Sequence, residues 1–395
     1  MVKDLGNNVY YIGCDDTDID LFESQYIVPD GVSYNSYVIL DEKIAVLDTC
    51  DGRKGDEWKA NLEEALNGRQ PDYLVVHHME PDHSTLAAWA MERFPGITVV
   101  AGAQALRMLP QFFPGISLEG RTLAVKEGDV LELGRHSLKF IAAPMVHWPE
   151  VMMSFDTSDG VLYSADGFGK FGALCNCGFY GRDDKDWSSE ASRYYFNIVG
   201  KYGVQVQCVL KKAAGLDIKA IRPLHGPILE DDLGEYLKLY DTWSSYTPET
   251  DGIFIACASI HGGALAAAAQ LAELLRRKGA AKVVLSDLTR SDMAGNVANA
   301  FRHPRMVVAA SSYDAGLFTP MHDFLHRLQI KGYCKRKVAI VENGSWAPSA
   351  GRVMREMLGT MKEIELVEPA VTIRSRMRPE DLPALETLAD AILNA

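Results

Sequence analysis

The stretch Val75-Val-His-His-Met-Glu-Pro-Asp-His-Ser84 is the part of the chain richest in potential metal ligands. An apolar strand is predicted to end here, and His78, Glu80, Asp82 and His83 follow it within six positions. Because side chains at a strand end alternate in direction, His78 and Glu80 are expected to share one face. The turn then presents Asp82 and His83 at a neighbouring point, which suits two metal ions side by side. Ser84 is predicted to be the N-cap of the helix that follows.

Three later segments each place one more ligand after an apolar strand or in a tight turn. They are Pro144-Met-Val-His147-Trp-Pro149, Leu162-Tyr-Ser-Ala-Asp166-Gly167 and Arg222-Pro-Leu-His225-Gly-Pro227. Each segment alone, like the first stretch, is more often an ordinary polar loop. Their occurrence together, in this order, argues against that interpretation.

The other histidines of the chain are interpreted without a metal. His77 is expected to point away from His78, into packing or into a hydrogen bond that supports a ligand. Those that fall in turns or on helices are interpreted as surface residues: His136, His303, His322 and His326.

Length and composition indicate two ordinary globular domains. The 395 residues exceed one typical domain, and 47% of them are hydrophobic and 24% charged. Polar and turn-forming residues cluster at 243–252, so we predict domains at 1–248 and 252–395. In the first half, helical patterns lie between hairpin signals such as 40–43 and 156–160, which predicts a layered α/β domain with antiparallel or mixed sheets.

The second half alternates regularly between strand-like and helical patterns. Strands are predicted at 253–259, 282–287, 306–311, 337–341 and 364–368. Amphipathic helices are predicted at 263–278, 292–302, 320–331, 349–359 and 380–394. Five such units predict a doubly wound parallel sheet, in which a ligand binds in the loops after the carboxyl ends of the strands.

Three of these loops have the composition of a ligand site. In Ala258-Ser-Ile-His-Gly-Gly-Ala264 the glycines let the backbone approach a phosphate, and the helix N-terminus favours the anion. A Gly-rich turn alone is a weak signal, because any tight turn has this composition. The other two loops are Ser311-Ser-Tyr-Asp-Ala-Gly-Leu317 and Glu342-Asn-Gly-Ser-Trp-Ala-Pro-Ser-Ala-Gly351.

Charge and cysteine content restrict the partners and the location. A net charge of -13 and a pI of 5.3 argue against nucleic acid and anionic membrane surfaces. No apolar stretch has the length of a membrane span. Seven cysteines without framework spacing, and an N-terminus without a signal-peptide pattern, are expected of a cytoplasmic protein. Cys175 and Cys177 have no partner pair, which argues against a four-thiolate metal site.

The order of these ligands resembles the metallo-β-lactamase fold, whose metal loop reads His-x-His-x-Asp-His and is followed by His, Asp and His. Here Glu80 stands at the position of the second histidine. That form, joined to a flavodoxin-like second half, resembles the flavodiiron proteins over nearly the whole chain. An added carboxylate favours harder ions such as iron over zinc. The resemblance implies an N-terminal αββα sandwich followed by a flavodoxin-like doubly wound parallel sheet.

The resemblance also implies two iron ions and their ligands. One ion would be bound by His78, Glu80 and His147, and the other by Asp82, His83 and His225, with Asp166 bridging them. In some members of the family the position that matches His83 is not a ligand. A pair of metal ions can hold both ends of a diatomic molecule, or two small molecules.

An FMN cofactor is implied as well, with its phosphate at the first loop and its ring between the other two. The residues expected at the FMN are Ser259, Ile260, His261, Gly262, Gly263, Ser311, Ser312, Tyr313, Asp314, Gly316, Asn343, Gly344, Ser345 and Trp346. Ala264 stands where flavodoxins usually have a threonine. A rubredoxin-like carrier would supply electrons for reducing dioxygen to water or nitric oxide to nitrous oxide. The family implies a head-to-tail homodimer, and the choice between homodimer and homotetramer stays open.

Two other functions stay open at this point. A dinuclear zinc hydrolase of the same fold would act on a thioester, lactone or phosphodiester, but Glu80 and the flavodoxin-like half count against it. A non-catalytic flavin carrier or sensor would have a degenerate metal site, whereas all seven candidate ligands are present. Metal analysis and the yellow colour of a flavin separate these functions.

Overall fold

The computed structural model describes residues 2–395, and its contacts divide the chain into two compact units. The first comprises the chain up to Tyr195 together with Tyr202–Ser244, and the second comprises Phe196–Lys201 together with Ser245–Ala395. Phe196–Lys201 joins the second unit although it precedes the predicted linker. Phe196 stacks on Phe301 with ring centroids 4.5 Å apart, and Asn197 Nδ2 donates to Ala294 O at 3.0 Å.

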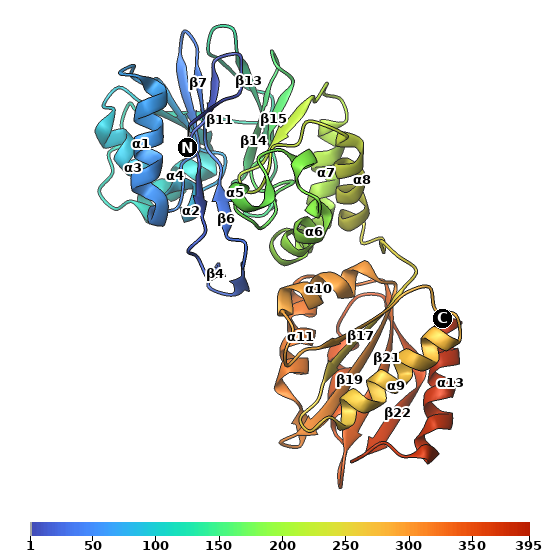
Figure 1. The fold of residues 1–395 in the computed structure, drawn as a ribbon. Coiled ribbons are helices and arrows are strands. Elements are labelled where there is room, and N and C mark those ends of the chain that lie inside the picture. Colours follow the sequence, from blue (N-terminus) through green and yellow to red (C-terminus); the bar gives the residue numbers. More distant parts are fainter. Residues whose placement is uncertain (1) are drawn as a thin grey trace. The chain divides into compact units, whose positions relative to one another are not determined.

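Two packed sheets form the centre of the first unit (Figure 1). The seven-stranded sheet has the order β1-β2-β7-β8-β9-β10-β11, with strands Lys3–Asp4, Val9–Tyr11, Tyr37–Leu40, Ile44–Leu47, Tyr73–Val75, Thr98–Gly102 and Thr122–Val125. The five-stranded sheet has the order β12-β13-β14-β15-β16, with strands Val130–Glu132, Ser137–Ala142, Met152–Asp156, Val161–Tyr163 and Ala220–Arg222. Buried side chains of both sheets, among them Ile39, Leu47 and Phe140, form one core between them.

Helices cover the outer faces of the two sheets. They are α1 (Gly55–Leu66), α3 (Ala87–Arg93) and α4 (Ala103–Phe112) on the first sheet, and α7 (Gly203–Ala213) and α8 (Leu233–Ser244) on the second (Figure 1). In α1 the buried side chains Trp58, Leu62 and Leu66 recur every fourth residue and therefore share one face. This layering confirms the predicted αββα sandwich.

The short elements of the first unit are the paired strands β3 (Cys14–Asp16) and β6 (Val32–Tyr34), the hairpin of β4 (Leu21–Phe22) and β5 (Tyr26–Ile27), and the helices α2 (Pro81–Ser84) and α5 (Leu174–Cys177). Helix α6 (Trp187–Ile198) begins in the first unit and ends in the second. No helix in the described part of the chain is both long enough and apolar enough to cross a membrane.

The second unit is the predicted doubly wound parallel sheet. Its strands, in the order β18-β17-β19-β21-β22, are Val283–Asp287, Ile253–Ala258, Arg305–Tyr313, Arg336–Gly344 and Ile364–Arg374, with the short β20 (Gly316–Leu317) pairing with β19. Its helices are α9 (Gly263–Arg277), α10 (Met293–Arg302), α11 (Thr319–Ile330), α12 (Ala350–Leu358) and α13 (Leu382–Leu393). Because helices cover both faces, every residue of β17 is buried. This strand order matches that of flavodoxins.

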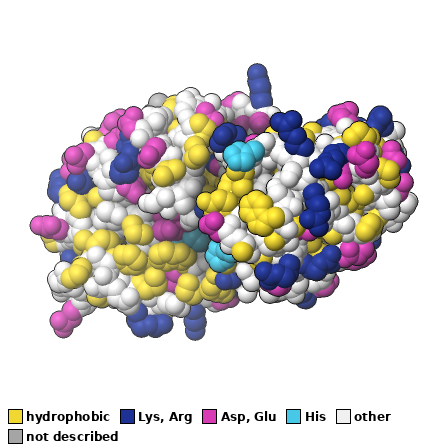
Figure 2. Space-filling model, turned by 90° about the horizontal axis from the view of Figure 1, so that it is seen from below, with side chains coloured by type: hydrophobic (Ala, Val, Ile, Leu, Met, Phe, Trp, Pro, Cys, Tyr) yellow, Lys and Arg dark blue, Asp and Glu magenta, His cyan; other side chains and the backbone are white. Residues whose placement is uncertain are grey.

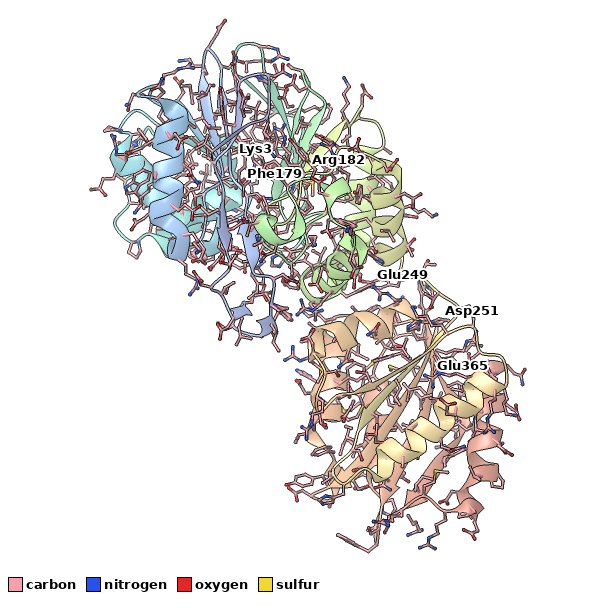
Figure 3. All side chains as sticks on the ribbon, viewed as in Figure 1. Lys3, Phe179, Arg182, Glu249, Asp251 and Glu365 are labelled. Atoms are coloured by element: carbon pink, nitrogen blue, oxygen red, sulfur yellow. The ribbon has the colours of Figure 1, made fainter. Side chains whose placement is uncertain are left out.

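Cation–aromatic contacts hold the N-terminal strand β1 against the rest of the first unit. Lys3 Nζ lies 3.7 Å from the ring centroid of Phe179 and 4.6 Å from that of Tyr180 (Figure 3). The guanidinium of Arg182 lies 4.4 Å from the same Tyr180 ring. Partly exposed contacts of this kind each contribute up to about 1 kcal/mol.

His136 and His303 are buried, so their prediction as surface residues was wrong. His303 Nδ1 lies 2.6 Å from Thr250 Oγ1, and burial lowers its pKa to about 4. His136 Nδ1 lies 2.7 Å from Asp156 Oδ2, and its Nε2 lies 2.8 Å from Asn7 O. Because both partners of His136 are acceptors, both ring nitrogens carry protons, and the bond to Asp156 raises the pKa of His136.

We expect His136→Gln to destabilise the protein more at low pH than at high pH. Because the pKa of His136 is raised in the folded chain, the hydrogen bonds of the imidazolium stabilise the fold fully below about pH 6.5, the ordinary pKa of histidine. This stabilisation is lost as the pH rises through the pKa of His136 in the folded chain. Urea unfolding midpoints of both proteins, compared between about pH 6 and pH 9, test this expectation. A difference between the midpoints that widens with rising pH would show that His136 is neutral in the folded chain.

Candidate functional site

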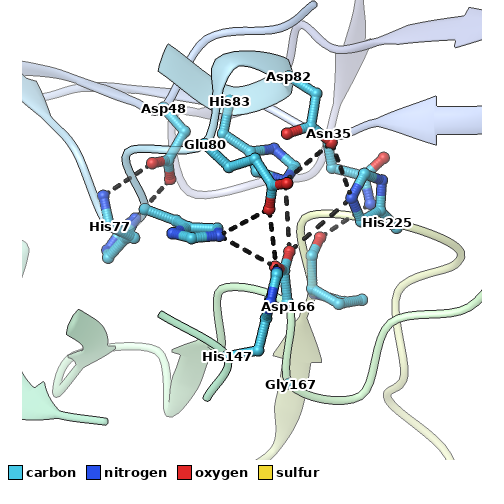
Figure 4. A network of polar contacts seen from close by, with 12 residues as sticks. Asn35, Asp48, His77, Glu80, Asp82, His83, His147, Asp166, Gly167 and His225 are labelled. Carbon is cyan, nitrogen blue, oxygen red and sulfur yellow. Dashed lines mark hydrogen bonds and ion pairs between the residues drawn. The ribbon is translucent and has the colours of Figure 1, made fainter. Parts of the chain in front are cut away.

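All seven side chains predicted as metal ligands converge at one end of the two sheets in the first unit (Figure 4). His78 and Glu80 follow β9, Asp82 and His83 lie on α2, His147 lies between β13 and β14, Asp166 follows β15 and His225 follows β16. Strands β15 and β16 are parallel neighbours, so the loops after them reach the same edge. The ligands therefore come from both sheets of the sandwich.

A first group consists of His78, Glu80, His147 and Asp166. His78 Nε2 lies 3.2 Å from Glu80 Oε2, and His147 Nε2 lies 3.0 Å from the same oxygen. The two histidine nitrogens lie 3.3 and 3.1 Å from Asp166 Oδ2. Four potential donor atoms thus surround one point, as in the coordination of a single metal ion.

Asp82, His83 and His225 form a second group beside the first. Asp82 Oδ2 lies 3.4 Å from His83 Nε2 and 3.3 Å from His225 Nε2. Asp166 faces this group with its other oxygen, Oδ1, which lies 3.3 Å from His83 Nε2 and 3.8 Å from His225 Nε2. The two oxygens of Asp166 therefore face different groups, which is the arrangement of a bridging carboxylate.

Several polar atoms of these groups are buried without a hydrogen-bond partner, namely both oxygens of Asp82, both ring nitrogens of His83 and Asp166 Oδ1. Buried polar atoms are nearly always satisfied, so such a cluster calls for a ligand. Two cations bound by these imidazole and carboxylate groups would satisfy all of these atoms except His83 Nδ1, which is not the nitrogen next to Asp82 and Asp166. The donor set therefore fits a pair of metal ions.

The charges of the two groups are strongly coupled. Burial opposes ionisation of Glu80, but hydrogen bonds with His147 and His78 outweigh it and lower the pKa of Glu80 to about 2. Burial likewise opposes the charged form of His147, whereas Asp166 and Glu80 raise its pKa to about 9. Glu80 and Asp166 are thus ionised, and a metal cation would take the place of the protons held by His78 and His147.

In His78 and His225, the ring nitrogen that faces away from the centre is bonded to the protein. His78 Nδ1 lies 2.8 Å from Glu150 Oε1, and His225 Nδ1 lies 2.7 Å from Ser33 O. Asn35 Nδ2 donates to Pro223 O at 2.8 Å and to Gly226 O at 2.7 Å, on either side of His225. Neither Asn35 nor Glu150 was predicted, although Glu150 follows His147 by only three positions.

The predictions for two other residues of the metal loop, His77 and Ser84, had different outcomes. His77 points away from the centre, as predicted, with Nδ1 2.5 Å from Asp48 Oδ2 and Nε2 2.8 Å from Ser154 Oγ. Ser84, predicted to cap a following helix, instead ends α2, which begins at Pro81. Its hydroxyl donates to Met79 O at 2.8 Å, because the helix starts earlier than the apolar pattern indicates.

A third cluster, His136, Asp156 and Asp159, also has the composition of a metal site. Both ring nitrogens of His136 are already bonded to Asp156 and Asn7, and Arg135 pairs with Asp159 at 2.7 Å. The positive charges of the protein therefore already satisfy these carboxylates. This cluster is an internal ion-pair network rather than a second metal centre.

The predicted cofactor residues of the second unit gather at the carboxyl ends of β17, β19 and β21. Gly262 has a φ of +83° and precedes α9, so the turn into the helix needs a glycine at this position. Ser312 Oγ accepts hydrogen bonds from Ser349 N at 2.8 Å and Ala350 N at 3.1 Å, which joins the second loop to the third. Ser259 Oγ in the first loop is buried without a partner.

Large apolar side chains of these loops are exposed: Trp346 at 92%, Tyr313 at 47% and Ile260 at 37%. Figure 2 views the molecule from this side and shows hydrophobic side chains next to lysine and arginine side chains. Ala264, at the position where a threonine was expected, has no exposed surface and packs in the core. It is therefore not available to contact a ligand in the loop.

A fourth segment, 374–378, reaches these loops and was not predicted. A Cβ atom on Gly263 would lie 2.7 Å from Ser375 O, and Asn343 Nδ2 donates to the same oxygen at 2.8 Å. Strand β22 extends to Arg374, whereas the predicted strand ended before Pro369. Proline is tolerated here because β22 is an edge strand of the sheet.

Known proteins resemble this chain in sequence and in fold. Residues 32–226 match the family described as "ODP family beta lactamase". An anaerobic nitric oxide reductase flavorubredoxin from Aliivibrio fischeri is 27% identical over 389 residues, which is 96% of this chain and 76% of that protein. The fold matches rubredoxin oxygen:oxidoreductase from Desulfovibrio gigas with a TM-score of 0.93 and 21% identity, over 100% of this chain and 98% of that chain. The chain also shares the fold of the flavodiiron protein from Thermotoga maritima.

The relatives of this chain include longer proteins. A putative diflavin flavoprotein A 1 from Thermosynechococcus vestitus is 32% identical over 272 residues, which is 68% of this chain but 47% of that protein. The chain thus spans about half the length of the curated diflavin relatives that it matches. The structural matches confirm both the sandwich and the flavodoxin-like sheet expected from the sequence.

Proposed function

We propose that this chain is a flavodiiron protein, an oxidoreductase that reduces dioxygen to water, nitric oxide to nitrous oxide, or both. The observation that carries the proposal is the position of Asp166, whose two oxygens face two adjacent groups of ligands. Glu80 in the first group adds a carboxylate where zinc sites of this fold have imidazole, which favours iron. Relatives named for nitric oxide and oxygen reduction support the same activity.

The proposed ligands form two sets, one for each of two iron ions. His78, Glu80 and His147 would hold one ion, Asp82, His83 and His225 the other, and Asp166 would contact both. When bound, the pair of ions supplies electrons to the gas and holds its atoms. The protein keeps the pocket buried and holds the outer nitrogens of His78 and His225, so the ligands are oriented before a metal ion arrives.

Aromatic rings around the ligands suit a small, uncharged substrate. The rings of Phe22 and Tyr194 lie 5.3 and 5.7 Å from the ring of His225, and the ring of Trp148 lies 5.2 Å from that of His78. A diatomic gas needs no charged group for recognition, and an apolar lining keeps bulk water away. The zinc hydrolase is not favoured, because Glu80 stands where zinc sites of this fold have a histidine.

The second unit is proposed to bind FMN and to receive electrons from a rubredoxin-like carrier. The glycine turn before α9 and the buried hydroxyl of Ser259 suit one phosphate group, while exposed Trp346 suits a flavin ring. Relatives named flavorubredoxin and rubredoxin oxygen:oxidoreductase support this donor. All seven cysteines are free thiols, in keeping with the proposed cytoplasmic location.

Cofactor analysis of the purified protein tests this function. After anaerobic reconstitution we expect about two iron ions per chain, because each group of ligands holds one ion. The flavin released on denaturation should be FMN rather than FAD, because the first loop suits one phosphate and lacks a Gly-x-Gly-x-x-Gly turn. The reduced protein should then consume dioxygen, nitric oxide or both in a gas electrode. Tightly bound zinc with no uptake of iron would refute the proposed oxidoreductase function.

A further inference from the structure

Glu150 is a buried carboxylate that contacts the metal loop without facing the metal centre. Its Oε1 atom accepts a hydrogen bond from His78 Nδ1 at 2.8 Å and another from Met79 N at 3.0 Å. The side chain has no exposed surface, and Oε2 has no hydrogen-bond partner. A buried carboxylate is costly, so its retention here calls for a function.

The position of Glu150 links two ligand segments that are far apart in the sequence. It lies in the turn that follows His147, and next to it Met152 N donates to His77 O at 2.9 Å. Its two bonds reach His78 itself and the amide of Met79, which leads to Glu80. His78, Glu80 and His147, which are three members of the first group, are thus tied together through one side chain.

We propose that Glu150 is the positioning residue of the first metal site. By accepting the Nδ1 proton of His78, it leaves the lone pair on Nε2, the nitrogen that lies 3.3 Å from Asp166. The second bond, from Met79 N, fixes the backbone between His78 and Glu80. This role rests on the proposed function only in that the groups bind metal ions, and it does not depend on which gas is reduced.

The second group is positioned by different residues, which provides a matched comparison. His225 Nδ1 donates to the backbone oxygen of Ser33 at 2.7 Å, so no carboxylate is involved. Asn35 holds the turn around His225 through Pro223 O and Gly226 O. Removing Glu150 should therefore affect one site, and removing the amide of Asn35 should affect the other.

Titration of the metal-free protein with Co²⁺ alone, followed by absorbance and calorimetry, separates the two sites. In Glu150→Ala we expect one binding step to weaken roughly 10- to 100-fold while the other step stays as in the wild type. Glu150→Gln should recover much of this loss, because its amide oxygen still accepts from His78 and Met79. Asn35→Ala should weaken the opposite step. Nitrogen NMR of the Zn²⁺-loaded protein should show a proton on Nδ1 of His78 in the wild type, because the metal ion then occupies Nε2.

Asp48→Asn is the control for a merely structural effect. Asp48 accepts from His77 N at 2.7 Å and lies 2.5 Å from His77 Nδ1, so it has the same kind of bonds one residue before His78. Both binding steps should be unchanged in this variant, even if its melting temperature falls.

Unchanged steps in folded Glu150→Ala, or the same loss in Asp48→Asn, would overturn the proposal. If Glu150→Ala does not fold, the absence of a proton on Nδ1 of His78 in the Zn²⁺-loaded wild type would overturn it. If both sites bind cobalt but the protein takes up no iron, the proposed function is refuted. The cobalt titrations of the Glu150, Asn35 and Asp48 variants would still test the role of Glu150.

Discussion

Asp166→Ala should abolish gas reduction and leave the chain unable to hold two metal ions. One oxygen of Asp166 lies 3.1 Å from His147 and 3.3 Å from His78, and the other lies 3.3 Å from His83. Among the described residues 2–395 no other side chain has ion-pair contacts with both groups within these distances, so an alanine removes a donor from each site at once. We expect activity to fall by more than the roughly 10- to 100-fold loss typical of a residue that only supports a ligand.

Iron content and gas consumption of the reconstituted variant measure this effect directly. Asp156→Ala is the matched control, because Asp156 is as deeply buried as Asp166 but its partner is His136, outside the metal centre. The control should melt at a lower temperature and keep its iron. If Asp166→Ala keeps about two iron ions per chain and full activity, the carboxylate is not a bridge.

Much of the architecture follows from local sequence patterns. In the second unit the predicted helix at 263–278 coincides with α9, Gly263–Arg277, because an apolar stripe with a helical period and a glycine turn mark it locally. The strand before it, β17, is apolar throughout because both faces of a parallel sheet are covered. Such elements are read from neighbouring residues alone, and the fold class follows from their regular alternation.

The features that were missed depend on partners far away in the sequence. His136 is buried because its ring bonds to Asn7, 129 positions earlier, and no local pattern announces that contact. Strand β22 continues beyond Pro369 because it lies at the edge of its sheet, which becomes known only with the strand order.

The candidate metal site likewise combines features that local sequence predicts with features that depend on distant residues. Four of its ligands stand within six positions of one another, and the other three follow strand or turn signals, so the chemistry is visible in the sequence. The residues that orient the ligands are not visible in the sequence, because Glu150 contacts His78 across 72 positions and Asn35 contacts Pro223 across 188 positions. A glutamate after a Trp-Pro turn and an asparagine after a tyrosine have no distinctive spacing, and only the folded chain gives them a role.

The location of the two candidate sites leads to a test of assembly. The metal ligands lie in the first unit and the proposed FMN loops lie in the second. We propose an assembly of at least two chains, in which the FMN of one chain delivers electrons to the iron ions of its partner. A two-fold arrangement supplies both such contacts at once. The proposal predicts that two differently disabled chains complement each other.

Asp166→Ala disables the metal site, and Gly263→Glu disables the flavin site, because a side chain at Gly263 would come within 2.7 Å of Ser375 O. Each variant alone should be inactive. When the two are unfolded together and refolded, a mixed dimer contains one intact flavin site facing one intact metal site, so up to about a quarter of the wild-type activity should return if chains pair at random. Differently tagged chains, purified through both tags in sequence, give the mixed dimer for assay, and iron and FMN contents verify that each retains its intact site. A mixed dimer with both cofactors bound but no activity would mean that electrons pass within one chain, because the only intact flavin and metal sites then lie on different chains and fail to communicate.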